Sequence, residues 1–169
     1  MRTTTILIAA ITFLIANFNF SKLCAQHVGE GSFMIGGGIS FESTVNDFGD
    51  NQSKLQITPL FGFYPIDNLG IGASFLLVYE DNFNTTRTQR GFGPFIRYYM
   101  TEGLFPQVQY VTISEERLNS TARGSGFIFS LGYTLFLNSS IGLEPSIFYS
   151  TVGSNSYGFQ LGFQGFLGR

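Results

Sequence analysis

The sequence has few of the residues on which most catalytic and metal sites depend. It contains one histidine, His27, one cysteine, Cys24, and no tryptophan in 169 residues. A Ser-His or Asp-His mechanism needs an imidazole beside the reacting group, and a zinc site needs clustered His or Cys ligands. We therefore expect no enzymatic activity, no metal and no cofactor.

Charge is also scarce. Charged residues make up 12% of the chain, where about 25% is usual for a soluble domain. The formal net charge is −2 and no basic patch stands out, so nucleic acid is not an expected partner. Hydrophobic residues reach 44%, yet beyond the N-terminal segment no continuous apolar run has the length of a membrane-spanning helix. A membrane protein without such a helix has to be a closed β-barrel, because lipid satisfies no loose backbone groups.

The N-terminus, residues 1–25, has the pattern of a secretory signal peptide. Arg2 supplies the positive charge, Ile6–Phe20 is the apolar segment, and Ala25 is a small residue before a cleavage site at Gln26. A permanent membrane anchor and lipidation at Cys24 are the alternatives.

Cleavage at this site leaves one predicted domain, residues 26–169, with no cysteine and hence no disulfide. Because Arg2 and Lys22 leave with the signal, the formal charge falls from −2 to −4.

Strict alternation of apolar and small or polar residues dominates the mature chain. It is clearest in Lys54–Glu80, where two alternating runs flank a turn at Pro65-Ile66-Asp67-Asn68. A period of two predicts β-strands. Eleven residues at about 3.4 Å each, tilted by about 45°, rise roughly 26 Å, the height of the apolar band of an outer-membrane barrel. The hairpin therefore predicts strands long enough to cross a membrane.

The same alternation recurs along the chain and predicts eight strands. They are Ser32–Glu42, Lys54–Tyr64, Leu69–Glu80, Arg90–Met100, Leu104–Ile113, Gly124–Leu137, Ile141–Tyr149 and Tyr157–Gln164. Long polar loops, Ser43–Ser53, Asp81–Gln89, Ser114–Arg123 and Thr151–Ser156, are expected to alternate with tight turns. This pattern is typical of an all-β, eight-stranded, antiparallel up-and-down transmembrane barrel with its termini in the periplasm.

Alternation alone does not say which face is outside. A lipocalin-like soluble barrel would need a charged exterior, whereas the second face here is Gly, Ser, Thr and Gln. We expect that small, polar face to line the lumen. Aromatic residues at the strand ends would then form girdles. These are Phe41, Tyr79, Tyr149 and Tyr157 at the outer interface and Phe63, Tyr98 and Tyr133 at the inner one.

Two short motifs give the chain a resemblance to a known group. They are Tyr64-Pro65-Ile66-Asp67-Asn68-Leu69-Gly70 and Gly93-Pro94-Phe95-Ile96-Arg97-Tyr98-Tyr99. The mature chain resembles small outer-membrane β-barrel proteins of the OmpA transmembrane-domain and OmpX type. The resemblance implies that the barrel assembly machinery inserts the chain, reading an aromatic last strand similar to Gln160-Leu161-Gly162-Phe163 and Phe166.

Two groups of charged residues can be placed on the predicted lumen face. Arg97 and Glu144 fall at similar depth on strands facing each other across the lumen, so we expect an ion pair, joined by Gln107 or Gln109. We interpret it as structural, with an ion gate as the alternative. Glu42, Lys54 and Glu80 are expected to meet at the outer mouth.

The expected role follows from a filled interior. Phe95, Phe136 and Phe148 on the inward face leave no wide pore. We expect a monomeric bacterial outer-membrane protein with a structural or surface-interaction role, contacting outer-membrane lipid. A narrow channel for small solutes and a soluble lipid-binding barrel are the alternatives.

Overall fold

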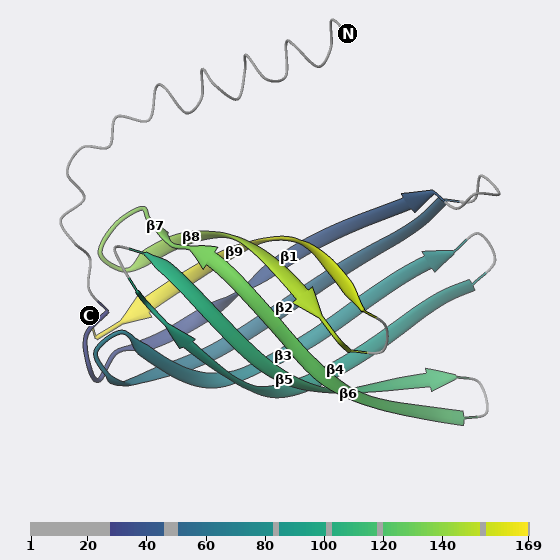
Figure 1. Ribbon diagram of the computed structural model, residues 1–169, viewed down its shortest axis with the longest axis horizontal. Helices are drawn as coiled ribbons and strands as arrows, with labels where there is room; N and C mark the ends of the chain where they lie inside the picture. The colour runs from purple at the N-terminus through teal and green to yellow at the C-terminus, as the bar shows by residue number, and fades with distance from the viewer. Residues whose placement is uncertain are drawn as a thin grey trace, which may run out of the picture.

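The chain forms a single β-barrel in the computed structural model (Figure 1), which describes residues 28–45, 51–82, 85–100, 103–117, 120–152 and 155–168. The predicted signal peptide and His27 lie outside these ranges. The strands are β1 Phe33–Val45, β2 Asn51–Ile66, β3 Leu69–Asn82, β4 Thr85–Tyr98, β5 Leu104–Arg117, β6 Ser120–Tyr133, β7 Leu135–Phe136, β8 Ile141–Ser150 and β9 Ser156–Leu167. The described ranges contain no helix long and apolar enough to cross a membrane.

Strands that are neighbours in sequence pair antiparallel, except β6 and β7, and two further pairings close the sheet. β1 pairs with β9, from Phe33↔Leu167 to Ile39↔Leu161, and β6 pairs with β8. The two-residue β7 continues β6 after an interruption at Thr134 and pairs with the same strand, β8. The barrel therefore has eight structural strands, and the predicted fold class is confirmed.

The strands are longer than the alternation predicted. The expected loops Ser43–Ser53, Asp81–Gln89 and Ser114–Arg123 are largely strand, since β1 reaches Val45, β4 begins at Thr85 and β5 reaches Arg117. The loop prediction was wrong because the alternation of apolar residues ends where the outer surface of the barrel leaves the hydrocarbon of the membrane. The strands continue beyond that point, since backbone pairing needs no apolar side chains. The β1–β2, β3–β4 and β5–β6 hairpins thus extend well beyond the β8–β9 hairpin (Figure 1).

The two ends of the barrel differ. Both ends of the described chain lie at one end, here called the terminus end, together with the short β2–β3 turn (Figure 1). The hairpins β1–β2, β3–β4, β5–β6 and β8–β9 close at the other, here called the hairpin end. In the short turn Asn68 has a positive φ of 64°, a conformation that Asn adopts more readily than most residues.

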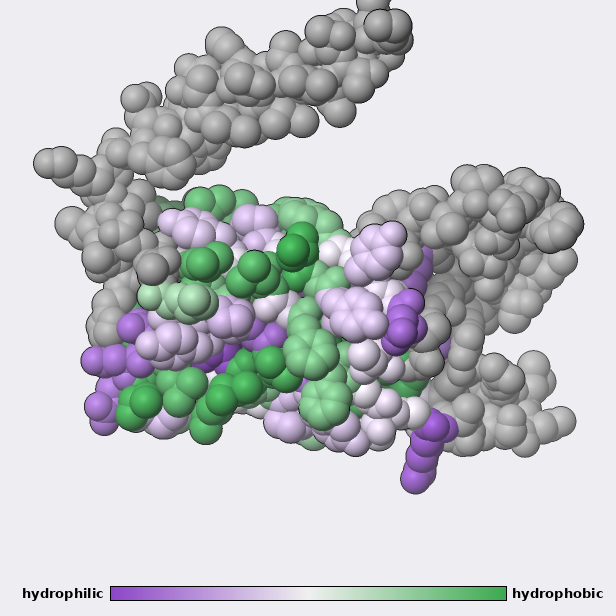
Figure 2. Space-filling view, in the orientation of Figure 1, coloured by the Kyte–Doolittle hydropathy of each residue, from purple (hydrophilic) through white to green (hydrophobic). Residues whose placement is uncertain are grey.

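The outward face carries the large apolar side chains, as predicted. Exposed members include Ile39, Phe61, Phe75, Phe92 and Phe163. Figure 2 shows hydrophobic side chains across one side of the barrel, with strongly hydrophilic ones mostly toward its ends. Five tyrosines of the predicted girdles are exposed. Tyr157 is 81% exposed, and the exposed fraction lies between 38% and 49% for Tyr79, Tyr98, Tyr133 and Tyr149.

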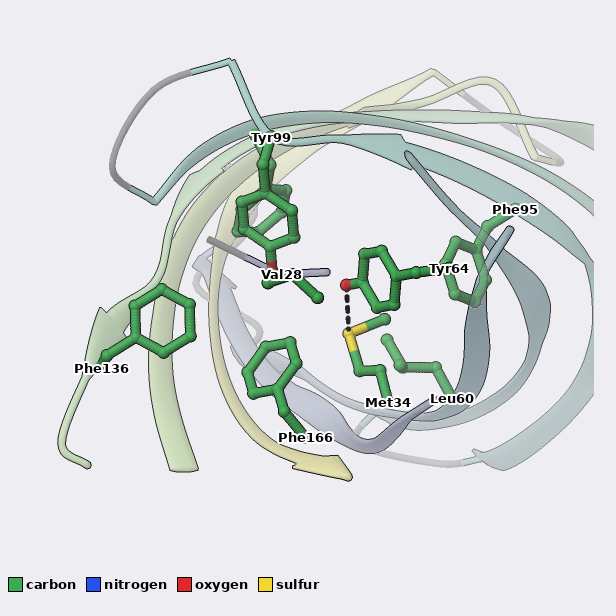
Figure 3. Close-up of a cluster of buried hydrophobic side chains, with 9 residues drawn as sticks. Val28, Met34, Leu60, Tyr64, Phe95, Tyr99, Phe136 and Phe166 are labelled. Carbon is green, nitrogen blue, oxygen red and sulfur yellow. Dashed lines mark hydrogen bonds between the residues drawn. The ribbon is translucent and has the colours of Figure 1, made fainter. Parts of the chain in front are cut away.

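The lumen is filled in layers, which can be followed along β5. Its inward residues run Phe105, Gln107, Gln109, Val111 and Ile113 from the terminus end to the hairpin end, and all are buried. Phe105 belongs to an apolar cluster at the terminus end (Figure 3), whose members are Val28, Met34, Leu60, Tyr64, Phe95, Tyr99, Phe105, Phe136 and Phe166. A second cluster lies toward the hairpin end and comprises Leu76, Val78, Val111, Ile113, Ile128 and Phe148. A polar layer separates them.

Candidate functional site: a buried ion pair in the lumen

The polar layer is built around Arg97 of β4 and Glu144 of β8. Both side chains point into the lumen. Residues at even spacing along a strand share a face, and Arg97 shares its face with the buried Phe95, as Glu144 does with the buried Phe148. One Nη1 of Arg97 lies 2.9 Å from each carboxylate oxygen of Glu144. Each side chain is 3% exposed. The structure thus brings together, across the lumen, the two residues that the sequence placed at similar depth.

The guanidinium of Arg97 has further partners. Its Nε donates to Oε1 of Gln107 at 2.9 Å, and its carbon lies 3.9 Å from the centre of the Phe105 ring. Nη1 also lies 3.3 Å from the hydroxyl of Tyr99. Gln107 is the direct register partner of Arg97, whereas Gln109 pairs with Phe95. Between the two glutamines that the sequence left open, register therefore selects Gln107.

The carboxylate of Glu144 is held by two hydroxyl donors in addition to Arg97. The Thr134 hydroxyl donates at 2.7 Å and the Tyr99 hydroxyl at 3.2 Å, and these two hydroxyl oxygens are 3.1 Å apart. Thr134 occupies the interruption between β6 and β7. With Arg97 and two hydroxyls around it, the buried carboxylate has the hydrogen-bond donors without which its burial would be costly.

The sequence analysis gave no role to Tyr99 or Thr134. The signal for Tyr99 was its place two residues after Arg97, on the same face of the same strand. Thr134 carried no such signal, because its contact with Glu144 depends on how β6 is interrupted. Hydroxyl groups on the inward face near an expected buried carboxylate are candidates that parity alone could have raised.

A small polar cavity adjoins the ion pair. Glutamines 56, 107, 109, 160 and 164 line it together with serines 130 and 146. The space is about 20 Å³, enough for one or two water molecules. Among the described residues, Nε2 of Gln109 and Oε1 of Gln164 are buried without a hydrogen-bond partner, a donor and an acceptor that water could satisfy. The lumen at this level holds water-sized space and no wide passage.

The predicted outer-mouth cluster lies at the hairpin end. Glu42 of β1 pairs in register with Lys54 of β2, which pairs in turn with Glu80 of β3. Arg87 of β4 stands opposite Glu80 and extends this row. Backbone register therefore aligns Lys54 with two acidic positions and adds Arg87, which the sequence analysis did not include; the side chains of Glu42, Glu80 and Arg87 lie outside the described residues, so the meeting of the three charges stays a prediction.

The apolar residues of β9 that resemble an assembly signal lie on both faces of the strand. Leu161 and Phe163 point outward, whereas Phe166 is 1% exposed and packs in the lumen, its ring centre 5.4 Å from that of Phe136. Of the residues that resemble an assembly signal, the outward pair is accessible to another molecule, and Phe166 helps to fill the barrel.

Comparison with known proteins supports the fold. No protein-family model and no curated protein matches the chain. The solved N-terminal β-barrel domain of OprF from Pseudomonas aeruginosa is similar, with a TM-score of 0.56 and 11% identity over 82% of this chain and 99% of that domain. OprG from the same organism, an outer-membrane protein, gives a TM-score of 0.48 and 12% identity, covering 83% and 91% of the two chains. The likeness to the OprF domain shows the fold of a small outer-membrane β-barrel.

Proposed function

We propose that the chain is an integral protein of the bacterial outer membrane with a sealed lumen. Residues 1–25 direct export, and the assembly machinery inserts the barrel as a monomer. Its role is structural, or is surface interaction through the hairpins at the hairpin end, which faces the outside of the cell. Catalysis is not part of this role.

The observation that carries the proposal is the inverted distribution of apolar side chains. Large apolar residues are exposed on the outward parity, and the inward parity holds a buried charge pair and five glutamines. Soluble monomers rarely expose a contiguous apolar patch above a few hundred Å². The exposed band supports insertion in lipid and argues against the soluble lipid-binding alternative.

Detergent dependence tests insertion. We expect the mature chain to refold in detergent micelles, to migrate faster on a gel before boiling than after, and to aggregate when the detergent is removed. A monodisperse, folded chain in plain buffer would rule out the proposal. Fractionation of expressing cells should place the protein with the outer membrane.

The sealed lumen makes a second, separable claim. The two apolar clusters and the ion pair between them support a barrel without steady conductance. The narrow-channel alternative is favoured by the water-sized polar cavity, which adjoins the Arg97–Glu144 pair.

Single-channel recording in planar bilayers distinguishes the two. We expect no conductance for the native barrel and none for Glu144→Gln, because the clusters on either side remain. Ser146→Ala, a neutral change in the same cavity, is the matched control. Unitary currents that appear with Glu144→Gln and not with Ser146→Ala would show that the pair is a gate.

A further inference from the structure

Two arginines stand on the outward face near the hairpin end. Arg90 of β4 pairs in register with Ser114 of β5, which pairs with Arg123 of β6. Both arginine side chains are exposed, and Ser114 is half-buried between them. Two strand spacings of about 4.8 Å separate the arginine Cα atoms by roughly 10 Å, so both guanidinium groups can reach one ligand between them.

The row lies at the aromatic border of the outward face. Both arginines stand outward of the aromatic residues on their own strands, whereas on β3 Tyr79 stands two positions outward of Leu77, the register partner of Arg90. Arg90 is two positions outward of Phe92, and Arg123 is four positions outward of Phe127; both aromatic side chains are about half exposed. On a strand tilted by about 45°, these offsets correspond to heights of about 5 and 10 Å. If the aromatic residues mark the edge of the hydrocarbon, the arginines lie at the depth of the lipid headgroups.

Among the residues that the structure describes, neither arginine side chain has an ionic partner. No side-chain hydrogen bond or ion pair involves Arg90 or Arg123 there, in contrast to Arg97. An outward arginine is costly at the bilayer midplane and is tolerated near the interface. The depth of the row therefore tolerates the two charges, and an anionic partner there would stabilise them.

We propose that Arg90, Ser114 and Arg123 bind a phosphate group of an outer-leaflet lipid. Guanidinium groups bind phosphate through paired, charge-assisted hydrogen bonds, and the serine hydroxyl can donate a third. The acyl chains of that lipid would lie against the aromatic and aliphatic band directly below. This inference rests on the proposed membrane insertion and adds a specific lipid contact to it.

Lipid binding to the refolded barrel in a neutral detergent tests the site. The probe is lipid A carrying its phosphates, titrated against native protein and the double variant Arg90→Gln/Arg123→Gln. We expect the double variant to bind at least about tenfold more weakly, since the loss of a single charge-assisted hydrogen bond already has that effect. Arg87→Gln is the matched control, since it removes the same charge from a position three residues away on the same strand and should change the dissociation constant less than twofold.

Two further probes identify the source of the phosphate. Dephosphorylated lipid A should bind native protein and double variant equally weakly, and millimolar inorganic phosphate should not displace the intact lipid. Displacement by inorganic phosphate would overturn the assignment to a lipid. Equal affinity of the double variant and the native protein for lipid A would overturn the site.

Failure of this inference and failure of the proposed function remain distinguishable. A double variant that keeps its affinity in a barrel that still shows heat-modifiable migration removes the phosphate site only. A chain that folds without detergent removes membrane insertion itself.

Discussion

Removing the charge of Glu144 should destabilise the barrel strongly. Glu144→Gln keeps the shape of the side chain and leaves the Arg97 guanidinium, 3% exposed, without its counter-ion. The remaining partners of that guanidinium are neutral: the Gln107 amide, the Tyr99 hydroxyl, the Met34 sulfur and the Phe105 ring. Removing one partner of a buried pair typically costs about 3–5 kcal/mol, and we expect a loss in that range.

The measurement is equilibrium unfolding by urea or guanidinium in phospholipid vesicles. The folded fraction is read from the two gel mobilities of unboiled samples. Arg97→Met should cost a similar amount, because it leaves the Glu144 carboxylate buried with hydroxyl donors alone.

The double variant Arg97→Met/Glu144→Gln decides whether the two side chains act as a pair. It removes both charges, and an uncharged core of similar volume is often no less stable than a buried ion pair. We expect the free energy of unfolding of the double variant to exceed, by about 2 kcal/mol or more, the value obtained by adding the two single losses. Coupling of this size is within the range for residues in contact. Additive losses, or a loss below about 1 kcal/mol for Glu144→Gln, would refute the reasoning.

Three other outcomes follow from the same structure. Gly93→Ala should reduce stability or prevent folding, because a Cβ there would overlap the backbone carbonyl of Tyr110 on the adjacent strand; unfolding measurements check this. Phe75→Arg, on the outward face of β3, should cost about 2–4 kcal/mol, whereas Tyr157→Arg near the interface should cost at most about 1 kcal/mol. Mass spectrometry of the exported chain should find Gln26 at its N-terminus, and an uncleaved chain would contradict the signal-peptide prediction.

The glycine substitution has a matched control in the chain. Gly29→Ala places a Cβ where nothing lies within 4 Å, so it should change stability little. Equal effects of the two changes would show that the close approach of β4 and β5 is not the cause.

The number of strands and their faces were predictable because one physical rule governs both. Side chains alternate across a strand, and a membrane requires the outward set to be apolar along each crossing. Ile39, Phe61 and Phe163 obey that rule in strands far apart in the sequence, and Arg97 and Glu144 were found because they break the small and neutral pattern of the inward set.

Strand ends were less predictable. The alternation of apolar and polar residues that predicts a strand depends on contact with lipid. It predicts nothing where β1, β4 and β5 continue past the apolar band. Their extension depends on backbone hydrogen bonds to a neighbouring strand, which polar residues such as Thr85 and Thr86 make as well as apolar ones. Composition therefore indicated loops where the structure has hairpins.

The sequence by itself determined the fold class, the inward and outward faces, and the depth of the Arg97 and Glu144 positions, because each depends on the order of residues within one strand. The tertiary structure alone decided what surrounds them. Register between strands placed Gln107 beside Arg97, the interruption after β6 brought Thr134 to Glu144, and pairing across β5 aligned Arg90 with Arg123. Such contacts depend on hydrogen bonding between strands, and alternation within a strand carries no information about it.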